Sequence, residues 1–228
     1  MSNVIEAHNL SKVYNPKTIP VYAINGVDLQ IEEGEFTALV GPSGSGKTTL
    51  LNLIGGLDSP SGGEVKIAGV DITNMNENKL IDFRLQNIGF VFQAYNLIPV
   101  LTASENVEFV MLMQKKPKRE REETARKLLQ EVGLNDRLNN RPSELSGGQQ
   151  QRVAVARALA SKPRFILADE PTANLDSKST ENLLEIMAKL NKEDKMTFIF
   201  STHDQRVIDK ARRVVTLVDG KIISDTKK

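Results

Sequence analysis

The sequence predicts an α/β fold with a mainly parallel sheet core, and three observations support this. An apolar run, Phe36–Val40, leads directly into the glycine-rich loop GPSGSGKTT at residues 41–49, and a helical pattern follows. Farther along the chain, short apolar runs alternate with longer helical segments. Such alternation is typical of parallel strands joined by crossover helices. A helix-rich stretch in the middle of the chain predicts an inserted α-helical subdomain.

Length and composition favour one globular domain with this insertion over two independent domains. The 228 residues include 30 Lys and Arg against 29 Asp and Glu. No overall basic field therefore points to nucleic acid or anionic lipid. The absence of cysteine excludes disulfides and thiolate metal sites. The N-terminal pattern is not that of a secretory signal, and every apolar run is too short to span a bilayer. We therefore expect a soluble chain that has any membrane role only through another polypeptide.

The N-terminal part of the chain predicts strands on both sides of the glycine-rich loop. Before the loop, strand patterns cover Val4–Leu10, Val27–Ile31 and Glu35–Val40, with a loop at Asn15–Pro20. After it we expect a helix from the loop, a strand at Glu64–Ala68, a helix at Asn76–Arg84 and a strand at Ile88–Phe92. The first strands would form an antiparallel region beside the parallel core.

The remainder of the chain predicts the inserted subdomain and then the rest of the core. Helices are expected at Ser104–Gln114, at Lys118–Glu131 and from Ser146 to about Ala160. The following elements are a strand at Arg164–Ala168, a helix at Ser177–Asn191, a strand at Met196–Ser201, a helix at Asp204–Lys210 and a hairpin of Val214–Val218 with Lys221–Ser224. We assign the catalytic core to residues 1–93 and 160–228, and the helical subdomain to about 94–159.

The glycine-rich loop fits the phosphate-binding template G-x-x-x-x-G-K-[ST] through Gly41, Gly46, Lys47 and Thr48. Residues without Cβ atoms let backbone N–H groups close around a phosphate, and the dipole of the following helix adds positive charge there. Lys47 would reach the β- and γ-phosphates of a nucleotide, and the Thr48 hydroxyl would bind Mg²⁺. The expected nucleotide-binding residues are Gly41, Pro42, Ser43, Gly44, Ser45, Gly46, Lys47, Thr48 and Thr49.

Two carboxylates end the apolar run FILADE, residues 165–170. An acid at the carboxyl end of a buried strand beside a phosphate loop is where Mg²⁺ is usually held, which assigns Asp169 to the metal. Glu170, one residue later, would orient and polarise the attacking water. The alternative is a strand that ends in two solvated acids, and the phosphate loop argues against it.

A second helix start with bare N–H groups lies in LSGGQQQR, residues 145–152. Ser146 is a favourable N-cap, and Gly147 and Gly148 expose the amides of the first turn. One chain thus offers two phosphate-binding helix termini, and one nucleotide does not obviously need both.

With these motifs in view, the chain resembles the ATP-binding-cassette (ABC) ATPases. The matching elements appear in the family's order: GPSGSGKTT, Gln93 in FVFQ, LSGGQQQR, FILADE, Asp176 at the end of NLD, and His203 in STHD. The resemblance implies the P-loop NTPase fold of ABC ATPases, hydrolysis of ATP to ADP and phosphate, and ATP with Mg²⁺ as the bound groups.

The resemblance also implies individual roles. Tyr14 matches the aromatic residue that stacks on adenine, with a tyrosine at a strand edge as the competing interpretation. Gln93 matches the residue that contacts Mg²⁺ or the lytic water and senses the transport partner. His203 resembles the histidine that hydrogen-bonds the γ-phosphate, so the catalytic set would be Glu170, His203, Gln93 and Lys47. His8 matches no motif and is interpreted as structural.

In this family the signature loop acts on the ATP of the other subunit. By resemblance, Ser146, Gly147, Gly148 and Gln149 would hold the γ-phosphate in trans, and Asp176 would cross the dimer seam. We therefore expect a second copy of the chain as a partner, in an ATP-dependent head-to-tail dimer that reopens on hydrolysis.

The segment IGFVFQAYNLIPVLTASENVEF and the run ILADEPTANLDSKS resemble the branch that serves lipoprotein release and macrolide export. A transmembrane permease subunit is the expected partner, docking near Gln93–Asn106 and holding the chain on the cytoplasmic face of the membrane. Import-type and cell-division cassettes are the alternatives. Cassettes that act on DNA or ribosomes fit less well, because the insert has no sustained heptads and the chain has one cassette and no cysteine. No nucleic-acid partner is expected.

Overall fold

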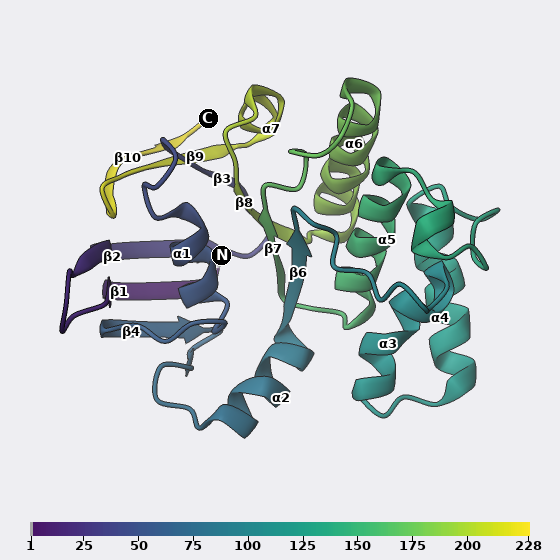
Figure 1. The fold of residues 1–228 in the computed structure, drawn as a ribbon, viewed down its shortest axis with the longest axis horizontal. Coiled ribbons are helices and arrows are strands. Elements are labelled where there is room, and N and C mark those ends of the chain that lie inside the picture. The colour runs from purple at the N-terminus through teal and green to yellow at the C-terminus, as the bar shows by residue number, and fades with distance from the viewer. Residues whose placement is uncertain (1) are drawn as a thin grey trace.

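The computed structural model describes residues 2–228 and contains two β-sheets and a group of helices beside them. Figure 1 shows the N-terminal sheet on one side, the main sheet in the middle and helices α3, α4 and α5 on the other side. The predicted α/β class is confirmed, including the antiparallel N-terminal region.

The N-terminal sheet is antiparallel throughout, in the order β2-β1-β4-β5. Its strands are β1 (Asn3–Tyr14), β2 (Val21–Glu32), β4 (Gly62–Ile67) and β5 (Val70–Asp71). The first two are longer than predicted, because polar residues interrupt their apolar patterns. Pairing nevertheless continues to Tyr14 with Val21, across several register irregularities.

The main sheet has the order β10-β9-β3-β8-β7-β6, in which only the β9–β10 hairpin is antiparallel. Its strands are β3 (Phe36–Val40), β6 (Ile88–Phe92), β7 (Phe165–Asp169), β8 (Thr197–Ser201), β9 (Arg213–Val218) and β10 (Lys221–Lys227). Because β3, β6, β7 and β8 are parallel, their carboxyl ends share one edge of the sheet. The segments that follow these strands carry most of the predicted catalytic residues.

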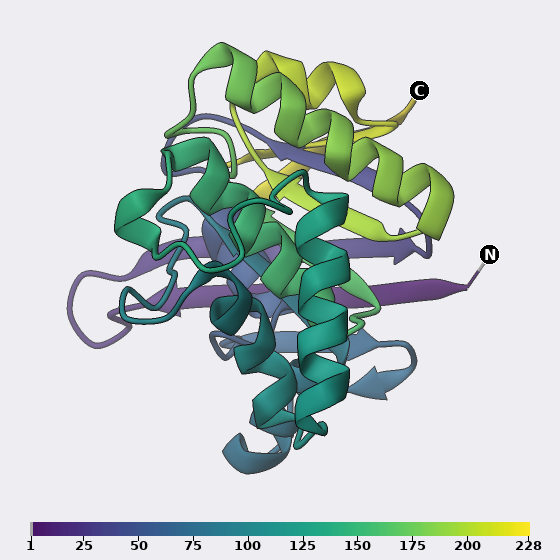
Figure 2. The same cartoon turned by 90° about the vertical axis from the view of Figure 1, so that its right-hand side faces the viewer.

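Helices cover the sheets and form the middle part of the chain. They are α1 (Lys47–Ile54), α2 (Glu77–Asn87), α3 (Ala103–Met113), α4 (Lys118–Glu131), α5 (Gly147–Ala160), α6 (Ser177–Asp194), α7 (Gln205–Lys210) and the short 3₁₀ helix η1 (Pro142–Glu144). In Figure 2 the helices of residues 103–160 lie in front of both sheets. Helix α4 has the predicted bounds. Ser146 and Asp204 are N-caps that lie outside helices α5 and α7, and β5 and η1 were not predicted because they are very short.

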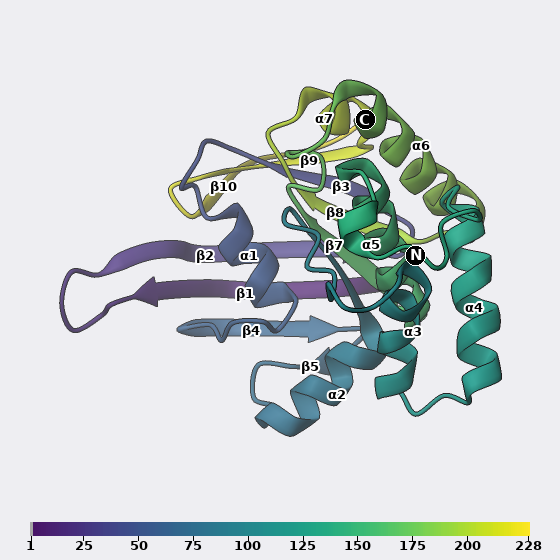
Figure 3. The same cartoon turned by 45° about the vertical axis from the view of Figure 1, so that its right-hand side comes forward.

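Three groups of buried apolar side chains make up the core. The first includes Leu50 and Ile54 of α1 together with Ile5 and Leu167. Figure 3 shows α1 beside the strands β1 and β2 of the N-terminal sheet. The second joins β3 and β8 to α6, and the third consists mainly of side chains from α3, α4 and α5. Helix α5 contributes to the second and third groups and so fixes the helices to the sheet. Within residues 2–228, no helix combines the length and apolar character needed to cross a membrane.

Candidate active site

The phosphate loop joins the end of β3 to the start of α1, and its conformation requires glycine. Gly41, Gly44 and Gly46 have φ of 151°, 79° and 101°, the left-handed region that side chains disfavour. A Cβ at Gly46 would collide with the carbonyl oxygen of Ala23, and one at Gly41 with that of Leu217. At Gly44 nothing lies within 4 Å of the corresponding position. The loop therefore presents bare backbone toward an open space, as a phosphate cradle requires.

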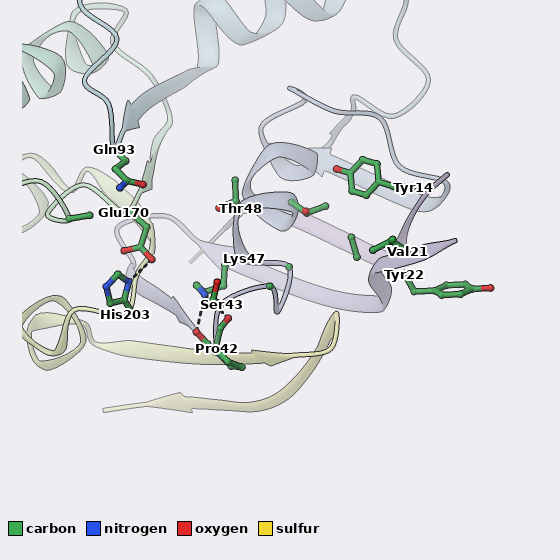
Figure 4. Close-up of a pocket in the computed structure, with 16 residues that line it drawn as sticks. Tyr14, Val21, Tyr22, Pro42, Ser43, Lys47, Thr48, Gln93, Glu170 and His203 are labelled. Atoms are coloured by element: carbon green, nitrogen blue, oxygen red, sulfur yellow. Dashed lines mark hydrogen bonds and ion pairs between the residues drawn. The ribbon is translucent and has the colours of Figure 1, made fainter. Parts of the chain in front are cut away.

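Lys47 directs its ammonium group back across this loop. Its Nζ donates to the carbonyl oxygens of Gly41 at 2.8 Å and Pro42 at 3.0 Å, as the dashed lines in Figure 4 show. The residue is only 9% exposed, and its charge meets carbonyl dipoles instead of a carboxylate. A buried cation without an anionic partner is suited to a phosphate oxygen.

Thr48 and Asp169 are brought together as the sequence predicts for the metal side. Thr48 Oγ1 donates to Asp169 Oδ1 at 3.0 Å, across 121 positions of the chain. No group of three His, Cys, Asp or Glu side chains suited to a metal occurs in residues 2–228. One hydroxyl and one carboxylate fit Mg²⁺, which usually keeps several waters and takes its remaining ligands from substrate phosphates.

Glu170 occupies a constrained position directly after β7. Its φ is 45°, uncommon for a residue with a side chain, and its N–H donates to the Ser201 carbonyl oxygen at 2.9 Å. Glu170 Oε1 lies 2.9 Å from His203 Nδ1. The other oxygen, Oε2, is buried and has no hydrogen-bond partner among the described residues. A buried carboxylate oxygen without a partner has an unused capacity to accept a hydrogen bond.

The pocket above the loop has a volume of about 770 Å³ and gathers most of the residues predicted for the site within one chain. Asp169 does not line it and reaches the site through its contact with Thr48. Figure 4 shows two groups of side chains around it, with the phosphate loop between them. One group is Gln93, Glu170 and His203; the other is Tyr14, Val21 and Tyr22. Asn174 Nδ2 donates to the Gln93 carbonyl oxygen at 3.0 Å, which fixes the backbone where Gln93 enters the pocket.

Two features of the pocket differ from what the sequence suggests. Tyr22, 63% exposed, lines it beside Tyr14, although no motif marks this residue. The sequence signal that could have identified Tyr22 was an aromatic residue at the start of β2. Tyr22 pairs with Val13, the neighbour of Tyr14 at the end of β1. Ser45 does not line the pocket: its side chain is buried, and its Oγ has no partner within the described chain. Any contact of Ser45 with a nucleotide would therefore involve its backbone.

The signature residues form a separate, well-ordered helix start. Ser146 Oγ accepts a hydrogen bond from the backbone N–H of Gln149 at 3.3 Å, and Gln149 Oε1 accepts one from the backbone N–H of Ser146 at 2.9 Å. The two bonds form a capping box at the start of α5. Asp176 caps α6 by accepting from the Ser179 N–H at 2.9 Å. Although residues 146–149 and 176 are all described, none of them lines the nucleotide pocket.

Comparison with known proteins decides the family. A family model described as "ABC transporter" matches residues 24–173, more than half of the chain. The chain belongs to the ABC transporter family. It is an ATP-binding subunit of this family, and its enzyme class is that of an ABC ATPase.

Relatives of this cassette match it over nearly its whole length. An ABC transporter ATP-binding protein of Thermotoga maritima is 48% identical over 97% of this chain and 94% of the relative. The lipoprotein-releasing system ATP-binding protein LolD of Anaeromyxobacter dehalogenans is 46% identical over 97% and 93%. The macrolide export ATP-binding/permease protein MacB of Aggregatibacter actinomycetemcomitans is 45% identical over 99% of this chain, which covers 35% of MacB.

Solved structures agree with this assignment. A dimeric structure of the ATP-binding cassette MJ0796 in a post-hydrolysis state, bound to ADP and Pi, matches with a TM-score of 0.90 at 44% identity. The match covers 98% of both chains. The cassette therefore has the ABC ATPase fold that the resemblance implied.

Proposed function

We propose that two copies of this cassette close head to tail around ATP and use its hydrolysis to drive a transmembrane permease. One observation supports the dimer above all others. The pocket of one chain gathers the phosphate loop, Gln93, Glu170 and His203, while the signature start at Ser146 lies outside it. A second copy would supply the missing amides, as the dimeric form of MJ0796 also suggests.

The residues predicted for catalysis and for the metal would then each have a part in hydrolysis. The Lys47 ammonium would exchange its two carbonyl partners for phosphate oxygens, where its charge is better compensated. Glu170, which lines the pocket, would orient a water toward the γ-phosphorus and accept its proton as the bond to ADP breaks. His203 would hold Oε1 of Glu170 and reach the γ-phosphate. Thr48, Asp169 and Gln93 would hold Mg²⁺, which when bound neutralises charge on the phosphates.

Mixing two inactive variants tests the shared site. Lys47→Ala removes the phosphate-loop cation. Ser146→Asp keeps a good N-cap but places a negative charge where a γ-phosphate would lie. In a mixed dimer one site keeps both intact halves, so we expect mixing to restore ATPase activity that neither variant has alone. Ser146→Asn is the matched control, because it keeps the cap without the charge and should remain active. Mixed dimers without recovery would contradict the shared site.

A groove beside the pocket supports a docking surface for the permease. It has a volume of about 600 Å³ and is lined mostly by apolar side chains of α2, β6, α3 and α5. Leu57, Ile81 and Met113 lie on it and are each more than 40% exposed. From the predicted docking segment Gln93–Asn106 only Asn96 lines the groove, so we propose that the surface extends beyond that segment.

The floor of this groove is linked to the segment that carries Gln93. The half-buried Arg157 guanidinium donates to the Tyr95 carbonyl oxygen at 2.8 Å and to that of Asn96. Tyr95 and Asn96 both have left-handed backbone, with φ of 60° and 51°. A short permease helix in the groove would press on this turn, two residues from Gln93. Coupling between transport and hydrolysis would follow from that proximity.

Two neighbouring residues allow a controlled test of docking. Met113 and Leu112 are similarly exposed at the end of α3, but only Met113 lines the groove. We expect Met113→Glu to abolish co-purification with a membrane-spanning partner and to leave the basal ATPase activity unchanged. Leu112→Glu should keep the partner. Loss of the partner in neither variant, or in both, would contradict docking in this groove.

The relatives LolD and MacB support the lipoprotein-release and macrolide-export branch over import-type or cell-division cassettes. We also propose that residues of about 94–159 form the helical subdomain. The core group of α3, α4 and α5, which includes Val107, Leu129 and Val153, supports this division. The permease would hold the cassette at the cytoplasmic face of the membrane.

A further inference from the structure

Lys12, Tyr14 and Asp58 form a compact cluster beside the part of the pocket that Tyr14 lines, where the base of a nucleotide would lie. Tyr14 Oη donates to Asp58 Oδ2 at 2.7 Å, and Lys12 Nζ donates to Asp58 Oδ1 at 2.6 Å. The same ammonium lies 4.9 Å from the centroid of the Tyr14 ring. One carboxylate thus holds both the hydroxyl of the aromatic residue and the cation beside its ring.

The backbone around Asp58 connects this cluster to the phosphate loop. Asp58 follows α1, the helix that begins at the loop, and its N–H donates to the Asn52 carbonyl oxygen at 3.2 Å. Lys12 also donates to the Ser59 carbonyl oxygen at 2.6 Å. Farther along, Ser61 Oγ accepts from the Val13 N–H at 3.0 Å. The segment after α1 is therefore fastened along the end of β1, next to Tyr14.

Asp58 does not itself line the pocket, whereas Tyr14 does. Tyr14 is 37% exposed, and the hydrogen bond from its hydroxyl to Asp58 restricts rotation of the ring. Burial alone would raise the pKa of the Asp58 carboxyl, but hydrogen bonds from Lys12 and Tyr14 outweigh it and lower this pKa. Burial and the Asp58 carboxylate raise the pKa of the Tyr14 hydroxyl, which therefore remains a donor at neutral pH.

We propose that Asp58, with Lys12, is a positioning residue that fixes the Tyr14 ring as the stacking surface for the nucleotide base. It increases affinity for nucleotides without touching base or phosphate. Restricting the ring before binding reduces the ordering cost of stacking. This inference rests on the proposed ATP site and on the stacking role that the resemblance to ABC ATPases gives Tyr14.

A ligand without a base separates this role from a structural one. We compare Mg-ATP with inorganic tripolyphosphate by calorimetric titration of the full chain. Asp58→Ala should weaken ATP binding about 3- to 10-fold, the range expected for a well-placed aromatic stack, and leave tripolyphosphate binding unchanged. Tyr14→Phe, which keeps the ring, should lose a similar amount, and the double variant should be no weaker than Asp58→Ala. Asp28→Ala is the control, because Asp28 also holds β1 through the Asn9 N–H but lies outside the pocket lining.

The outcomes distinguish the possible failures. Equal weakening of both ligands by Asp58→Ala would mean that the residue acts on the phosphate loop through α1, and would overturn the inference. If Tyr14→Ala leaves the ratio of the two affinities unchanged, the stacking role of Tyr14 itself fails. If Tyr14→Ala changes the ratio and Asp58→Ala does not, only the role of Asp58 fails. Should Asp58→Ala not fold, Lys12→Met and Tyr14→Phe test the same cluster with smaller changes.

Discussion

His203 Nδ1 lies 2.9 Å from Glu170 Oε1, and this contact joins the segment after β8 to the end of β7. The two residues are 33 positions apart, and each follows a strand of the parallel core. The other oxygen of Glu170, Oε2, is buried and has no partner among the described residues. The contact with His203 therefore holds the Glu170 carboxylate in one orientation.

Replacing Glu170 by Gln should stop hydrolysis and spare binding. Gln keeps the size of the side chain but cannot take a proton from water, so kcat should fall by about 10²- to 10⁴-fold. The dissociation constant for ATP should change little, because Glu170 does not form the phosphate loop. Phosphate release and calorimetric titration measure the two quantities. Glu185→Gln, on the exposed face of α6, should behave as wild type. Normal turnover by Glu170→Gln would refute the base assignment.

The two histidines of the chain provide a matched pair. His203→Ala removes both the partner of Glu170 and the proposed donor to the γ-phosphate, so kcat should fall by about 10²-fold. His8, on β1, lies 3.9 Å from Asp28 and outside the pocket lining. His8→Ala should therefore leave kcat within about twofold, a change well below the value of one hydrogen bond. Equal effects of the two substitutions on steady-state kcat would argue against a catalytic role of His203.

Asn174 should influence catalysis through the backbone of Gln93. Asn174→Ala removes the donor to the Gln93 carbonyl oxygen and loosens the segment that enters the pocket. The net contribution of one such hydrogen bond is about 1 kcal/mol, so its loss should lower kcat 3- to 10-fold and leave the KM for ATP close to wild type. Steady-state kinetics measure both, with the exposed Asn135→Ala as control. A raised KM with unchanged kcat would instead place Asn174 in nucleotide binding.

The free energy of unfolding should depend on pH through an ion-pair network that joins Arg213 of β9 to Asp225 of β10 and to Glu35. Arg213 is buried, donates to Asp225 Oδ1 at 2.8 Å and Oδ2 at 2.7 Å, and also contacts Glu35. These hydrogen bonds lower the pKa of the Asp225 carboxyl despite the opposing effect of burial. A lowered folded-state pKa contributes stability above the ordinary value of about 3.9 and loses it as the pH falls through the folded-state value.

Asp225→Asn should therefore destabilise the protein at pH 7 by roughly 1 kcal/mol, a modest figure because Asp225 is partly exposed and screened by solvent. The difference from wild type should narrow as the pH falls below about 4. Urea unfolding at a series of pH values measures it. A difference that stays constant or widens at low pH would contradict the assignment.

Local motifs made much of the site predictable. The glycine spacing of residues 41–46, the acids Asp169 and Glu170 at the end of β7 and the cap at Ser146 are each encoded within a few residues, and the structure places them at these positions. Helix α4 also matches its prediction, because its charged and apolar positions repeat at helical spacing and Pro117 precedes it. These features follow from local sequence patterns and could be predicted without knowledge of any tertiary contact.

Contacts between distant segments were not predictable in this way. Asp58 meets Tyr14 across 44 positions, and Asn174 meets Gln93 across 81. No local pattern marks either pair, because both arise only when sheets and helices have packed. Arg157 likewise looks like one more charged residue of a helix, yet it is half-buried and donates hydrogen bonds to two carbonyl oxygens. The residues that position other groups of the site through such long-range contacts could therefore not be identified from the sequence alone.

Light scattering on Glu170→Gln tests most directly whether two chains complete each ATP site. With Mg-ATP this variant should have the mass of two chains, without nucleotide the mass of one, and adding Ser146→Asp should return it to one. If Glu170→Gln stays a single chain at saturating ATP, while the wild type hydrolyses ATP at full rate at the same concentration, the two-chain site is contradicted.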